Sequence, residues 1–347
     1  MTIVKWGIIG PGNIAHNFAD GLKESSFGKL ISIASYSEDR RNNFGNKYNI
    51  NKSLQFSNYE DLLNCEDIDA VYISIPHTFH AEWTINAVNK GKHVLCEKPA
   101  AINFKEGKRI IEEVKKAGVF YMEGFMYRCH PQIKELIDLI KRKKIGEVKY
   151  IKSSFGFDMG KTVIESRLFR KDLAGGAILD VGLYPISFSR LIAGVALNKK
   201  FINPTKISGK AKIGETNVDE ISYATLNFEN SIVAEAATAI RKNMINNAII
   251  EGTNGVIEID QPWGPGRDGG PYHSNFKITI NNKTQTINFK GPEHLFFFEA
   301  ELASQTILKH RQEVPHPGMT WEDTLGNLKV LDEWRKAIGY SLPQDNV

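Results

Sequence analysis

Short apolar runs alternate with helical spacing over the first third of the chain. Runs with the length and composition of buried strands occupy residues 3–9, 30–35, 70–75, 93–97 and 119–123. Between the last two runs, Ile110, Ile111 and Val114 would share one face of a helix over residues 104–117. Strands that alternate with helices are typical of βαβ units. The pattern therefore predicts a parallel sheet covered by helices on both faces.

The second half of the chain is richer in strands than the first. Segments rich in β-branched and aromatic residues lie at residues 149–157, 221–228, 232–239, 248–251, 256–259 and 276–289. Asn281-Asn282-Lys283 interrupts the last of these segments and predicts a hairpin turn. Helices after Glu293 and after Thr320 are expected to close the fold.

The first predicted strand ends in a glycine-rich turn. The sequence GPGNIA at residues 10–15 fits the pattern G-x-G-x-x-G/A and leads into a helix predicted over residues 13–22. Gly10 permits the tight turn, Gly12 lets the backbone approach a pyrophosphate, and the small Ala15 lets the helix pack against the strand. The alternative is a glycine-rich turn without a ligand. We expect a dinucleotide site formed by the glycines and the start of the helix: Gly10, Gly12, Asn13 and Ile14.

The end of the second predicted strand bears on the choice of cofactor. A carboxylate there would bind the ribose 2′-hydroxyl of NAD, but the chain has Ser35 at this place, followed by Arg40 and Arg41. A hydroxyl and a guanidinium suit a 2′-phosphate, with which arginine pairs through two hydrogen bonds. We therefore expect NADP(H), bound by Ser35, Arg40 and Arg41. Glu38 and Asp39 lie close by and both arginines also fit the next helix as surface residues, so NAD(H) stays open.

Composition and charge exclude several classes of protein. Hydrophobic residues make up 41% and charged residues 24% of the chain, which is close to the globular average and excludes disordered and fibrous proteins. The formal net charge is only +4. The one dense basic run, at residues 141–144, follows a helical pattern and precedes Gly146, as cations at the end of a helix do. We therefore expect no nucleic-acid partner.

Cysteine usage and hydropathy predict a cytoplasmic protein. Cys65, Cys96 and Cys129 are odd in number and widely spaced, so they predict neither a disulfide framework nor a zinc ribbon. No uncharged stretch approaches the roughly 20 apolar residues of a membrane span. The first residues lack the basic segment and long apolar run of a signal peptide. We expect no association with a membrane.

Two further motifs are specific to one enzyme family when they occur together. CEKP at residues 96–99 ends a predicted strand, and GGAILDVGLY occupies residues 175–184. With the glycine-rich turn, these motifs resemble the glucose–fructose oxidoreductase, inositol dehydrogenase and rhizopine-catabolism (Gfo/Idh/MocA) family over essentially the whole chain. YRCHP at residues 127–131 is similar to the segment in which family members cross between domains. Similar to the family's closing signature are Asp323, Thr324, Leu325 and Asn327.

The resemblance implies an α/β Rossmann domain plus an α+β domain with an open, mostly antiparallel sheet. We place an NADP(H)-binding Rossmann domain at residues 1–124 and a substrate and oligomerisation domain at residues 125–347, whose C-terminal helices pack back on the first domain. In the family, one face of the open sheet carries helices and the other often forms a subunit interface. Because an apolar face of that size would otherwise be a liability, we expect a homodimer or homotetramer.

The resemblance also implies roles for Lys98, Asp180 and Tyr184. In the family the lysine lies beside nicotinamide and substrate, and the aspartate and the following tyrosine or histidine supply proton transfer. Hydride addition to a carbonyl develops negative charge that a donor must meet, and an ammonium lowers the pKa of a nearby tyrosine from about 10. Asp180 would orient Lys98 or a substrate hydroxyl. Asp180 and Tyr184 share a face if the segment is helical, although Pro185 is able to interrupt such a helix.

Further residues after the predicted strands are expected to contact the cofactor. Pro76, His77 and His80 follow the strand at residues 70–75, where the family's loop covers the nicotinamide. Glu97 would contact the cofactor ribose or the loop backbone. His77 and His80 are three residues apart, but no third ligand is evident nearby in the sequence, so no metal is expected.

Two regions keep a structural and a functional interpretation open. Arg128 and His130 suit either the cleft or a structural role where the chain crosses between domains. The turn-rich segment at residues 261–271 would border the active site or a neighbouring subunit.

Together these features predict an NADP(H)-dependent oxidoreductase that transfers a hydride between the nicotinamide and a secondary alcohol or carbonyl of a sugar or sugar derivative. Tyr184 would give or take the proton with Lys98, and Asp180 would assist. Family members of the inositol type carry histidine in place of Tyr184, which disfavours a cyclic polyol. The alternatives are a trans-dihydrodiol or aldose 1-dehydrogenase, an enzyme that keeps its cofactor bound while it oxidises one sugar and reduces another, and a non-catalytic NADP(H)-binding regulatory protein.

Overall fold

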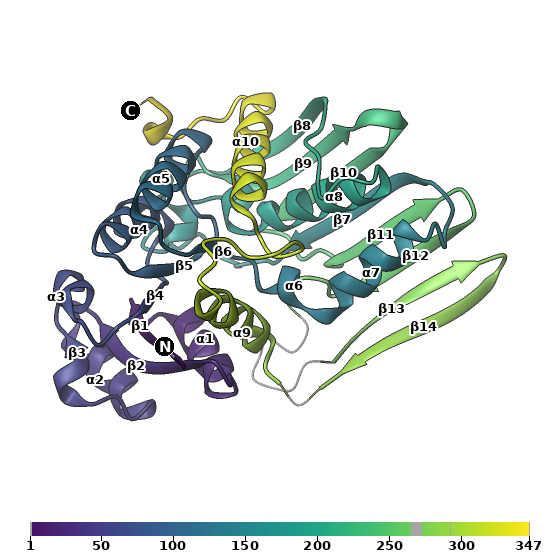
Figure 1. Cartoon of the computed structure of the whole chain (residues 1–347). Coiled ribbons are helices and arrows are strands. Elements are labelled where there is room, and N and C mark those ends of the chain that lie inside the picture. Colours follow the sequence, from purple (N-terminus) through teal and green to yellow (C-terminus); the bar gives the residue numbers. More distant parts are fainter. Residues whose placement is uncertain (1, 265–272, 292, 347) are drawn as a thin grey trace.

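A six-stranded parallel sheet forms the first part of the fold (Figure 1). The structure, a computed structural model, describes residues 2–264, 273–291 and 293–346. The strand order is β3-β2-β1-β4-β5-β6. The strands are β1 (Val4–Ile9), β2 (Gly28–Ala34), β3 (Gln55–Phe56), β4 (Ala70–Ile73), β5 (His93–Glu97) and β6 (Tyr121–Gly124). The predicted parallel sheet is confirmed, and the sequence misses only β3, because a strand of two residues has no periodic signal.

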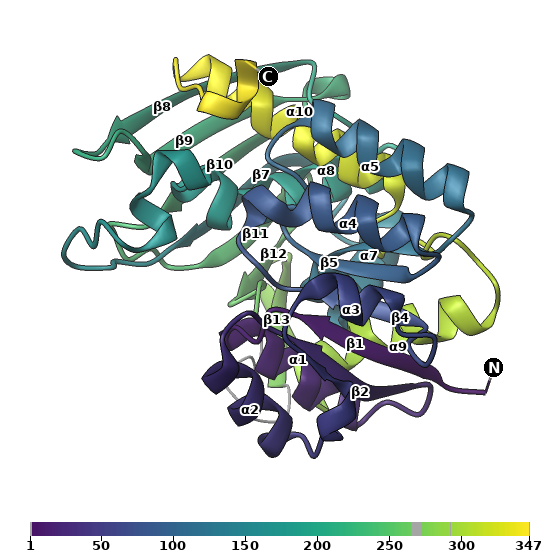
Figure 2. The same cartoon turned by 90° about the vertical axis from the view of Figure 1, so that its left-hand side faces the viewer.

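Helices cover both faces of this sheet, as predicted (Figure 2). They are α1 (Asn13–Lys23), α2 (Glu38–Lys47), α3 (Tyr59–Asn64), α4 (His80–Asn89) and α5 (Phe104–Ala117). Buried residues of α1 and α2 share a core with one face, and those of α3, α4 and α5 share a core with the other. α5 has its predicted bounds because both ends are capped: the Asn103 side chain accepts a hydrogen bond from the Glu106 N–H, and Gly118 adopts a φ of +68°.

An eight-stranded sheet forms the second part, with the order β14-β13-β12-β11-β7-β10-β9-β8. The strands are β7 (Val148–Gly156), β8 (Lys206–Ile213), β9 (Asp219–Asn227), β10 (Val233–Ala239), β11 (Asn247–Gly252), β12 (Gly255–Asp260), β13 (His273–Ile280) and β14 (Lys283–Lys290). Among these strands only β10 and β7 pair in parallel, so the predicted, mostly antiparallel sheet is confirmed. The sequence does not predict the edge strand β8, because three of its outward positions are lysines and its inward positions include glycine and alanine.

The segment predicted at residues 276–289 is part of a hairpin. β13 and β14 pair with each other and are joined at Asn281 and Asn282, whose φ angles are +50° and +61°. Two successive residues in the left-handed conformation are typical of a type I′ turn, and asparagine tolerates that conformation well. The predicted hairpin turn is confirmed.

Helices connect the two sheets. They are α6 (Met126–Cys129), α7 (Pro131–Lys141), α8 (Leu183–Ala196), α9 (Leu295–Leu308) and α10 (Trp321–Ala337). α8 packs on β7 and β10, α9 packs on α1, and α10 contacts α5 on one side and β8 on the other (Figures 1 and 2). The helical stretch at residues 171–196 is long and apolar enough to cross a membrane, but its apolar window is completely buried inside the fold, which is typical of a core helix.

The basic run at residues 141–144 lies partly outside the helix that it was expected to end. α7 ends at Lys141, so the other cations of the run lie in the turn that follows, and Gly146 adopts a φ of +76° beyond them. All of these cations are exposed.

A buried ion-pair network joins α6, α8 and α10. Arg128 on α6 and Arg190 on α8 both donate to the carboxylate of Asp323 on α10, at 2.6 and 2.5 Å. Removing one partner of a buried network of this kind costs about 3–5 kcal/mol. Arg128 therefore has the structural role, and so does His130, whose Nδ1 accepts a hydrogen bond from the Gln132 N–H and caps α7.

The face of the second sheet opposite α8 bears a row of alternating charges. From β10 to β13 the register places side by side Glu235, Lys152, Ile249, Glu258 and Lys277. The charged members of this row are exposed. The expectation of an apolar open face is wrong for this row, where neighbouring strands present opposite charges to each other.

Candidate active site

The glycine-rich turn joins β1 to the N-terminus of α1. Gly10 adopts a φ of +88°, and a Cβ there would lie 2.6 Å from Ile75 Cγ2, so only glycine fits. A Cβ on Gly12 would meet a single backbone oxygen at 3.7 Å, which leaves the space beside this backbone open. No side chain caps α1, and its first turn, which starts with Asn13 and Ile14, holds no acidic residue. The N–H groups of this turn therefore suit the pyrophosphate of a dinucleotide.

After β2, the two arginines that were predicted to bind a 2′-phosphate have different surroundings. Arg41 Nη1 donates to the Ser35 carbonyl oxygen at 2.8 Å, so this guanidinium braces the end of the strand. The Ser35 hydroxyl accepts a hydrogen bond from the Ser37 N–H at 3.2 Å. Ser37 in turn caps α2, and the Arg40 side chain is exposed. Arg40 is therefore the guanidinium accessible to a 2′-phosphate, although two acidic residues share its helical turn.

The turn after β4 contacts the second part of the chain. Pro76 starts this turn, and His77 Nε2 lies 2.9 Å from the carbonyl oxygen of Leu173. Burial, together with the nearby guanidinium of Arg167, lowers the pKa of His77 to about 3. His77 is therefore neutral at pH 7 and links the two parts of the chain through a backbone oxygen.

His80 ties the same turn to the segment that follows β5. Its two ring nitrogens lie 2.8 Å from the carbonyl oxygens of Pro99 and Ile75. A metal ligand needs a ring nitrogen with a free lone pair, and both nitrogens of His80 face backbone oxygens. The described residues contain no group of three His, Cys, Asp or Glu side chains that could hold a metal ion.

Lys98 follows β5 and reaches across to the second part of the chain. Its ammonium donates to the main-chain oxygen of Asp180 at 2.8 Å. The preceding residue, Glu97, is buried; its carboxylate accepts a hydrogen bond from the Tyr72 hydroxyl and another from the Lys98 N–H at 3.2 Å. Two of the predicted catalytic residues are therefore in direct contact, through the backbone of Asp180 rather than through its carboxylate.

The glycines of the motif at residues 175–184 leave room for the neighbouring backbone. A Cβ on Gly175 would lie 2.4 Å from a backbone oxygen, and Gly176 adopts a φ of +114°, with Asp219 Oδ1 only 2.1 Å from the place of a Cβ. A π-helical turn, Ile178–Gly182, then leads directly into α8. Pro185, which has no N–H to donate, lies where the π-helical turn passes into α8 and does not interrupt the helix.

The carboxylate of Asp180 pairs with Arg167. Arg167 Nη2 lies 2.7 Å from Asp180 Oδ1, and the arginine side chain is 42% exposed whereas the aspartate is 8% exposed. Burial opposes ionisation of Asp180, but Arg167 and Lys98 together hold its pKa below the usual range. Sequence analysis did not single out Arg167; its only signal was a place among several cations that precede the glycine motif.

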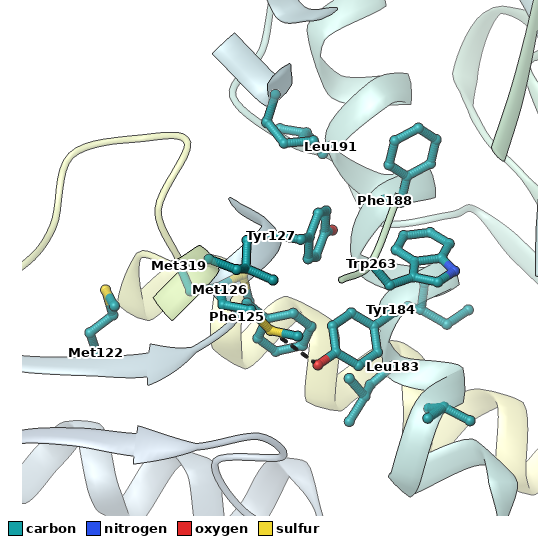
Figure 3. Close-up of a cluster of buried hydrophobic side chains, with 14 of the residues drawn as sticks. Met122, Phe125, Met126, Tyr127, Leu183, Tyr184, Phe188, Leu191, Trp263 and Met319 are labelled. Carbon is teal, nitrogen blue, oxygen red and sulfur yellow. Dashed lines mark hydrogen bonds between the residues drawn. The ribbon is translucent and has the colours of Figure 1, made fainter. Parts of the chain in front are cut away.

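Tyr184 lies in a buried cluster of aromatic side chains (Figure 3). Its hydroxyl donates to Met126 Sδ at 3.4 Å, and the Lys98 ammonium lies 5.3 Å from the centre of its ring. Rings with centres 5.3–5.9 Å from that of Tyr184 are those of Phe125, Phe155, Tyr127 and Trp263. The structure therefore brings Lys98, Asp180 and Tyr184 together.

Three residues of this cluster were missed from the sequence. Phe125, Met126 and Phe155 reach Tyr184 from two segments far apart in the chain, and a single sequence carries no signal for such contacts. Trp263 belongs to the turn-rich segment predicted at residues 261–271, so that part of the segment borders the site. The rest of it, from residue 265, lies outside the described residues.

Family models match most of the chain. The oxidoreductase family with an NAD-binding Rossmann fold matches residues 4–125, and the GFO/IDH/MocA C-terminal domain matches residues 133–258. The chain belongs to the Gfo/Idh/MocA family. The predicted resemblance is confirmed, and with it the assignment of this Gfo/Idh/MocA protein as an oxidoreductase with a nicotinamide-dinucleotide domain.

Relatives of this Gfo/Idh/MocA chain match along its full length. Trans-1,2-dihydrobenzene-1,2-diol dehydrogenase from Xenopus tropicalis is 30% identical over 98% of this chain and 99% of the relative. The enzyme of the same name from Mus musculus is 28% identical over 99% of both chains.

Solved structures share the fold. KijD10, a 3-ketoreductase from Actinomadura kijaniata in complex with NADP and TDP-benzene, has a TM-score of 0.82 at 25% identity, over 97% of this chain and 98% of that one. An aldose-aldose oxidoreductase from Caulobacter crescentus has a TM-score of 0.83 at 23% identity, over 96% and 97% of the two chains, which shows the fold alone.

Proposed function

We propose that this chain is an NADP(H)-dependent oxidoreductase that moves a hydride between the nicotinamide and a secondary alcohol or carbonyl carbon of a sugar or sugar-like diol. The observation that carries the proposal is the contact of Lys98 with Asp180 and with the ring of Tyr184, where the carboxyl end of β5 meets the start of α8. The names of similar proteins support it, because a ketoreductase and diol dehydrogenases both act at such a carbon.

The backbone of the first sheet would hold the cofactor. Gly10, Gly12 and the N-terminal N–H groups of α1 suit the pyrophosphate, and Arg40 suits the 2′-phosphate. Bound there, the nicotinamide supplies the hydride or accepts it. NADP(H) is favoured over NAD(H) because Ser35 replaces the carboxylate that would bind a free 2′-hydroxyl, and because KijD10 was crystallised with NADP.

Lys98 and Tyr184 would stabilise charge and move the proton. A substrate oxygen gains negative charge as hydride reaches its carbon, and the Lys98 ammonium is placed to meet that charge. The Tyr184 hydroxyl would give the proton to this oxygen in reduction and take it in oxidation. Its bond to Met126 Sδ is weak, since a thioether is a poor acceptor, so a substrate oxygen would replace it readily. Asp180 would hold Lys98 through its main-chain oxygen.

A diol of an aromatic ring is the second candidate substrate. The ring of Tyr184 packs among aromatic rings, and its hydroxyl donates to the thioether of Met126. A flat, mostly apolar ring with two hydroxyls fits such a lining. The names of the similar diol dehydrogenases support this alternative.

A second copy of the chain is part of the proposal. The row of charges on the open sheet face is self-complementary about a two-fold axis that runs along β11 at Ile249. Rotation about this axis sets Lys152 against the partner's Glu258, and Glu235 against the partner's Lys277. Such an arrangement is isologous, as most homodimers are.

Turnover of defined substrates by two variants tests the proposed function. NADPH oxidation and NADP⁺ reduction would be followed with D-xylose, D-glucose, a 3-ketosugar and trans-1,2-dihydrobenzene-1,2-diol. With the substrate that the wild type turns over, we expect Lys98→Ala and Tyr184→Phe each to lower kcat by at least about 100-fold, while NADPH still quenches the protein fluorescence.

Tyr127→Phe is the matched control for this test. Tyr127 belongs to the same aromatic cluster, but its hydroxyl bonds to Ser187, so we expect its removal to change kcat little. If Lys98→Ala or Tyr184→Phe kept a kcat close to that of the wild type, that residue would have no part in the reaction. Failure of NADPH and NADH alike to bind would contradict the proposed function as a whole.

A further inference from the structure

A buried carboxyl bonds to the backbone of the segment that carries Lys98. Glu123 lies on β6, next to β5, and its side chain is 1% exposed. Its Oε1 accepts a hydrogen bond from the Ala100 N–H at 2.8 Å, two residues after Lys98. Its Oε2 accepts one from the Thr324 hydroxyl on α10, also at 2.8 Å.

A second buried carboxyl makes the matching contact on the other side of the site. Asp219 begins β9 and is also 1% exposed. Its Oδ2 accepts a hydrogen bond from the Ile178 N–H at 2.9 Å, two residues before Asp180, and another from the Ser222 hydroxyl at 2.8 Å. Its other oxygen fills the space that Gly176 leaves by having no Cβ.

We infer that Glu123 and Asp219 are positioning residues for the proposed reaction, each of which fixes the backbone of one catalytic segment, the first for Lys98 and the second for Asp180 and Tyr184. The inference rests on the proposed function, because it presumes that these segments perform the chemistry. Neither carboxyl touches the Lys98 ammonium or the Tyr184 hydroxyl, so both act through main-chain N–H groups alone.

The two carboxyls are well suited to this task. A hydrogen bond from an N–H to a carboxylate is about twice as strong as one to a neutral oxygen. Glu123 also ties its segment to α10, and the Asp219 carboxylate is held in place by the hydroxyl of Ser222 on the same strand. A lysine with several rotatable bonds is held accurately only if the backbone that carries it is fixed.

Protonation would weaken both contacts within the physiological range of pH. Burial raises the pKa of Glu123 and that of Asp219 to about 7 each, against the hydrogen bonds that lower them. Above pH 7 the carboxylates bind the two N–H groups most strongly. Below it, each N–H faces a neutral carboxylic acid.

The groups packed around the two carboxyls set this pH range. Glu123 faces Asp323 on α10, which raises its pKa, and Arg190 on α8, which lowers it. Cys96 and Tyr121 on the adjoining strands are neutral, because burial raises the pKa of each.

The pKa of Asp219 depends on a second set of neighbours. Arg335 on α10 lowers its pKa, and the Ser222 hydroxyl does so by hydrogen bonding. Tyr340 also lies nearby and is neutral at pH 7, because burial raises its pKa.

Ionisation of the two carboxyls lowers the free energy of unfolding of the whole chain, although it strengthens their hydrogen bonds within the site. The folded-state pKa of each lies above its unfolded value near 4, so their contribution to stability is complete below about pH 4 and is lost as the pH rises through 7. The local bonds to Ala100 and Ile178 strengthen over the same range. Ionisation near neutral pH therefore weakens the fold as a whole and tightens the two catalytic segments.

Backbone hydrogen exchange of the full chain with NADPH tests the inference without a substrate. Glu123→Gln and Asp219→Asn keep the shape and an acceptor oxygen but remove the charge. At pH 8 we expect Glu123→Gln to lower the protection of the Ala100 amide by about 10-fold, and Asp219→Asn to do so for the Ile178 amide. Each variant should leave the other amide unchanged, and in the wild type both protections, corrected for intrinsic rates, should fall from pH 8 to pH 6.

Asp69→Asn is the matched control. Asp69 accepts a hydrogen bond from the Lys5 N–H at 2.8 Å, but at the amino ends of the central strands β1 and β4, so its change should leave both amides as they are. With an accepted substrate, kcat of the wild type should rise between pH 6 and pH 8 more than that of the double variant, with KM for NADPH unchanged. A purely structural role would lower the melting temperature and leave these pH dependences as they are.

Unchanged protection of Ala100 and Ile178 in both variants would overturn the inference, even where Lys98→Ala still abolishes turnover. If a variant fails to fold, the wild type alone still tests the inference. Protection of Ala100 and Ile178 that stays the same between pH 8 and pH 6 in the wild type would overturn the inference. If Lys98→Ala kept full turnover, the proposed function would fail instead, whatever the exchange data showed.

Discussion

Main-chain oxygens hold two side chains of the site, those of Lys98 and His77. The Lys98 ammonium bonds to the carbonyl oxygen of Asp180, and His77 contacts the carbonyl oxygen of Leu173. Backbone oxygens keep their place when side chains change. We therefore expect the contact between the two parts of the chain at this site to survive the loss of the Asp180 carboxylate, which is bound to Arg167.

At the scale of single residues, Arg40 and Arg41 are predicted to act differently on cofactor affinity. Arg40→Ala removes an exposed guanidinium that suits a 2′-phosphate, so NADPH affinity should fall by about 10-fold or more and NADH affinity should not change. Arg41→Ala removes the brace on the Ser35 carbonyl oxygen, so it should weaken NADPH and NADH alike. Fluorescence titrations with both cofactors would measure these effects, and equal loss for the two cofactors in Arg40→Ala would contradict the role given to that residue.

The sequence predicted the catalytic candidates but not the residues that hold them. Lys98, Asp180 and Tyr184 stand in motifs, and the structure brings them together. Arg167 and Asp219 stand in no motif, and their contacts depend on chain segments that meet only in the folded state. A single sequence has no signal for a buried carboxyl whose partner is a backbone N–H.

At the scale of elements, the π-helical turn Ile178–Gly182 depends on the glycines before it. Gly176 combines a φ of +114° with the contact to Asp219, so Gly176→Ala should lower the free energy of unfolding by about 3 kcal/mol or more. Gly91 also has a positive φ, +73°, but nothing lies within 4 Å of the place of a Cβ. Gly91→Ala should therefore cost only about 1 kcal/mol. Urea unfolding of both variants would measure this, and equal losses would show that the contact with Asp219 matters little.

Elements were predictable where their ends and faces are marked locally. α5 has an asparagine cap, an apolar stripe and a terminal glycine, and its observed bounds are the predicted ones. β3 and β8 were missed because both owe their pairing to a neighbouring strand rather than to their own pattern. The π-helical turn has no sequence pattern of its own, since its apolar spacing is compatible with an ordinary α-helix.

At the scale of the whole molecule, the charge row predicts a defined two-fold arrangement. Lys152→Glu and Glu258→Lys should each weaken self-association by at least about 10-fold, because like charges then face each other across the axis. A mixture of the two variants should restore it, since Glu at position 152 of one copy then meets Lys at position 258 of the other, and the wild-type pair is kept on the second side. Sedimentation of each variant and of the mixture would measure this.

Circular dichroism is the control for that experiment, because each substitution also places like charges on neighbouring strands. A wild-type chain that stays monomeric at micromolar concentration would contradict the proposed dimer. A mixture that associates no better than either variant alone would show that the axis does not run along β11.

The fold as a whole was within reach of the sequence, whereas the buried ion pairs that join its two parts were not. Alternation of strands and helices predicts the parallel sheet, and a series of β-rich segments predicts the antiparallel one. That α10 lies between α5 and β8 follows from long-range contacts, among them the ion pairs of Asp323 with Arg128 and Arg190. These pairs connect residues far apart in the chain, and no local pattern marks them.

The ion pairs of Asp323 also bear on the order in which the protein assembles as it is made. Synthesis runs from the N-terminus, so Arg128 and Arg190 leave the ribosome long before the carboxylate that both of them bind. Until Asp323 emerges, burial of either guanidinium without its partner is costly. We therefore expect the core around α8 to stay incompletely packed until then. The strands of the first sheet, which end at Gly124, are available much earlier. The second part of the chain would therefore complete its folding only after α10 has been synthesised. Because α10 packs against α5 and against β8, its arrival completes the packing of both parts together.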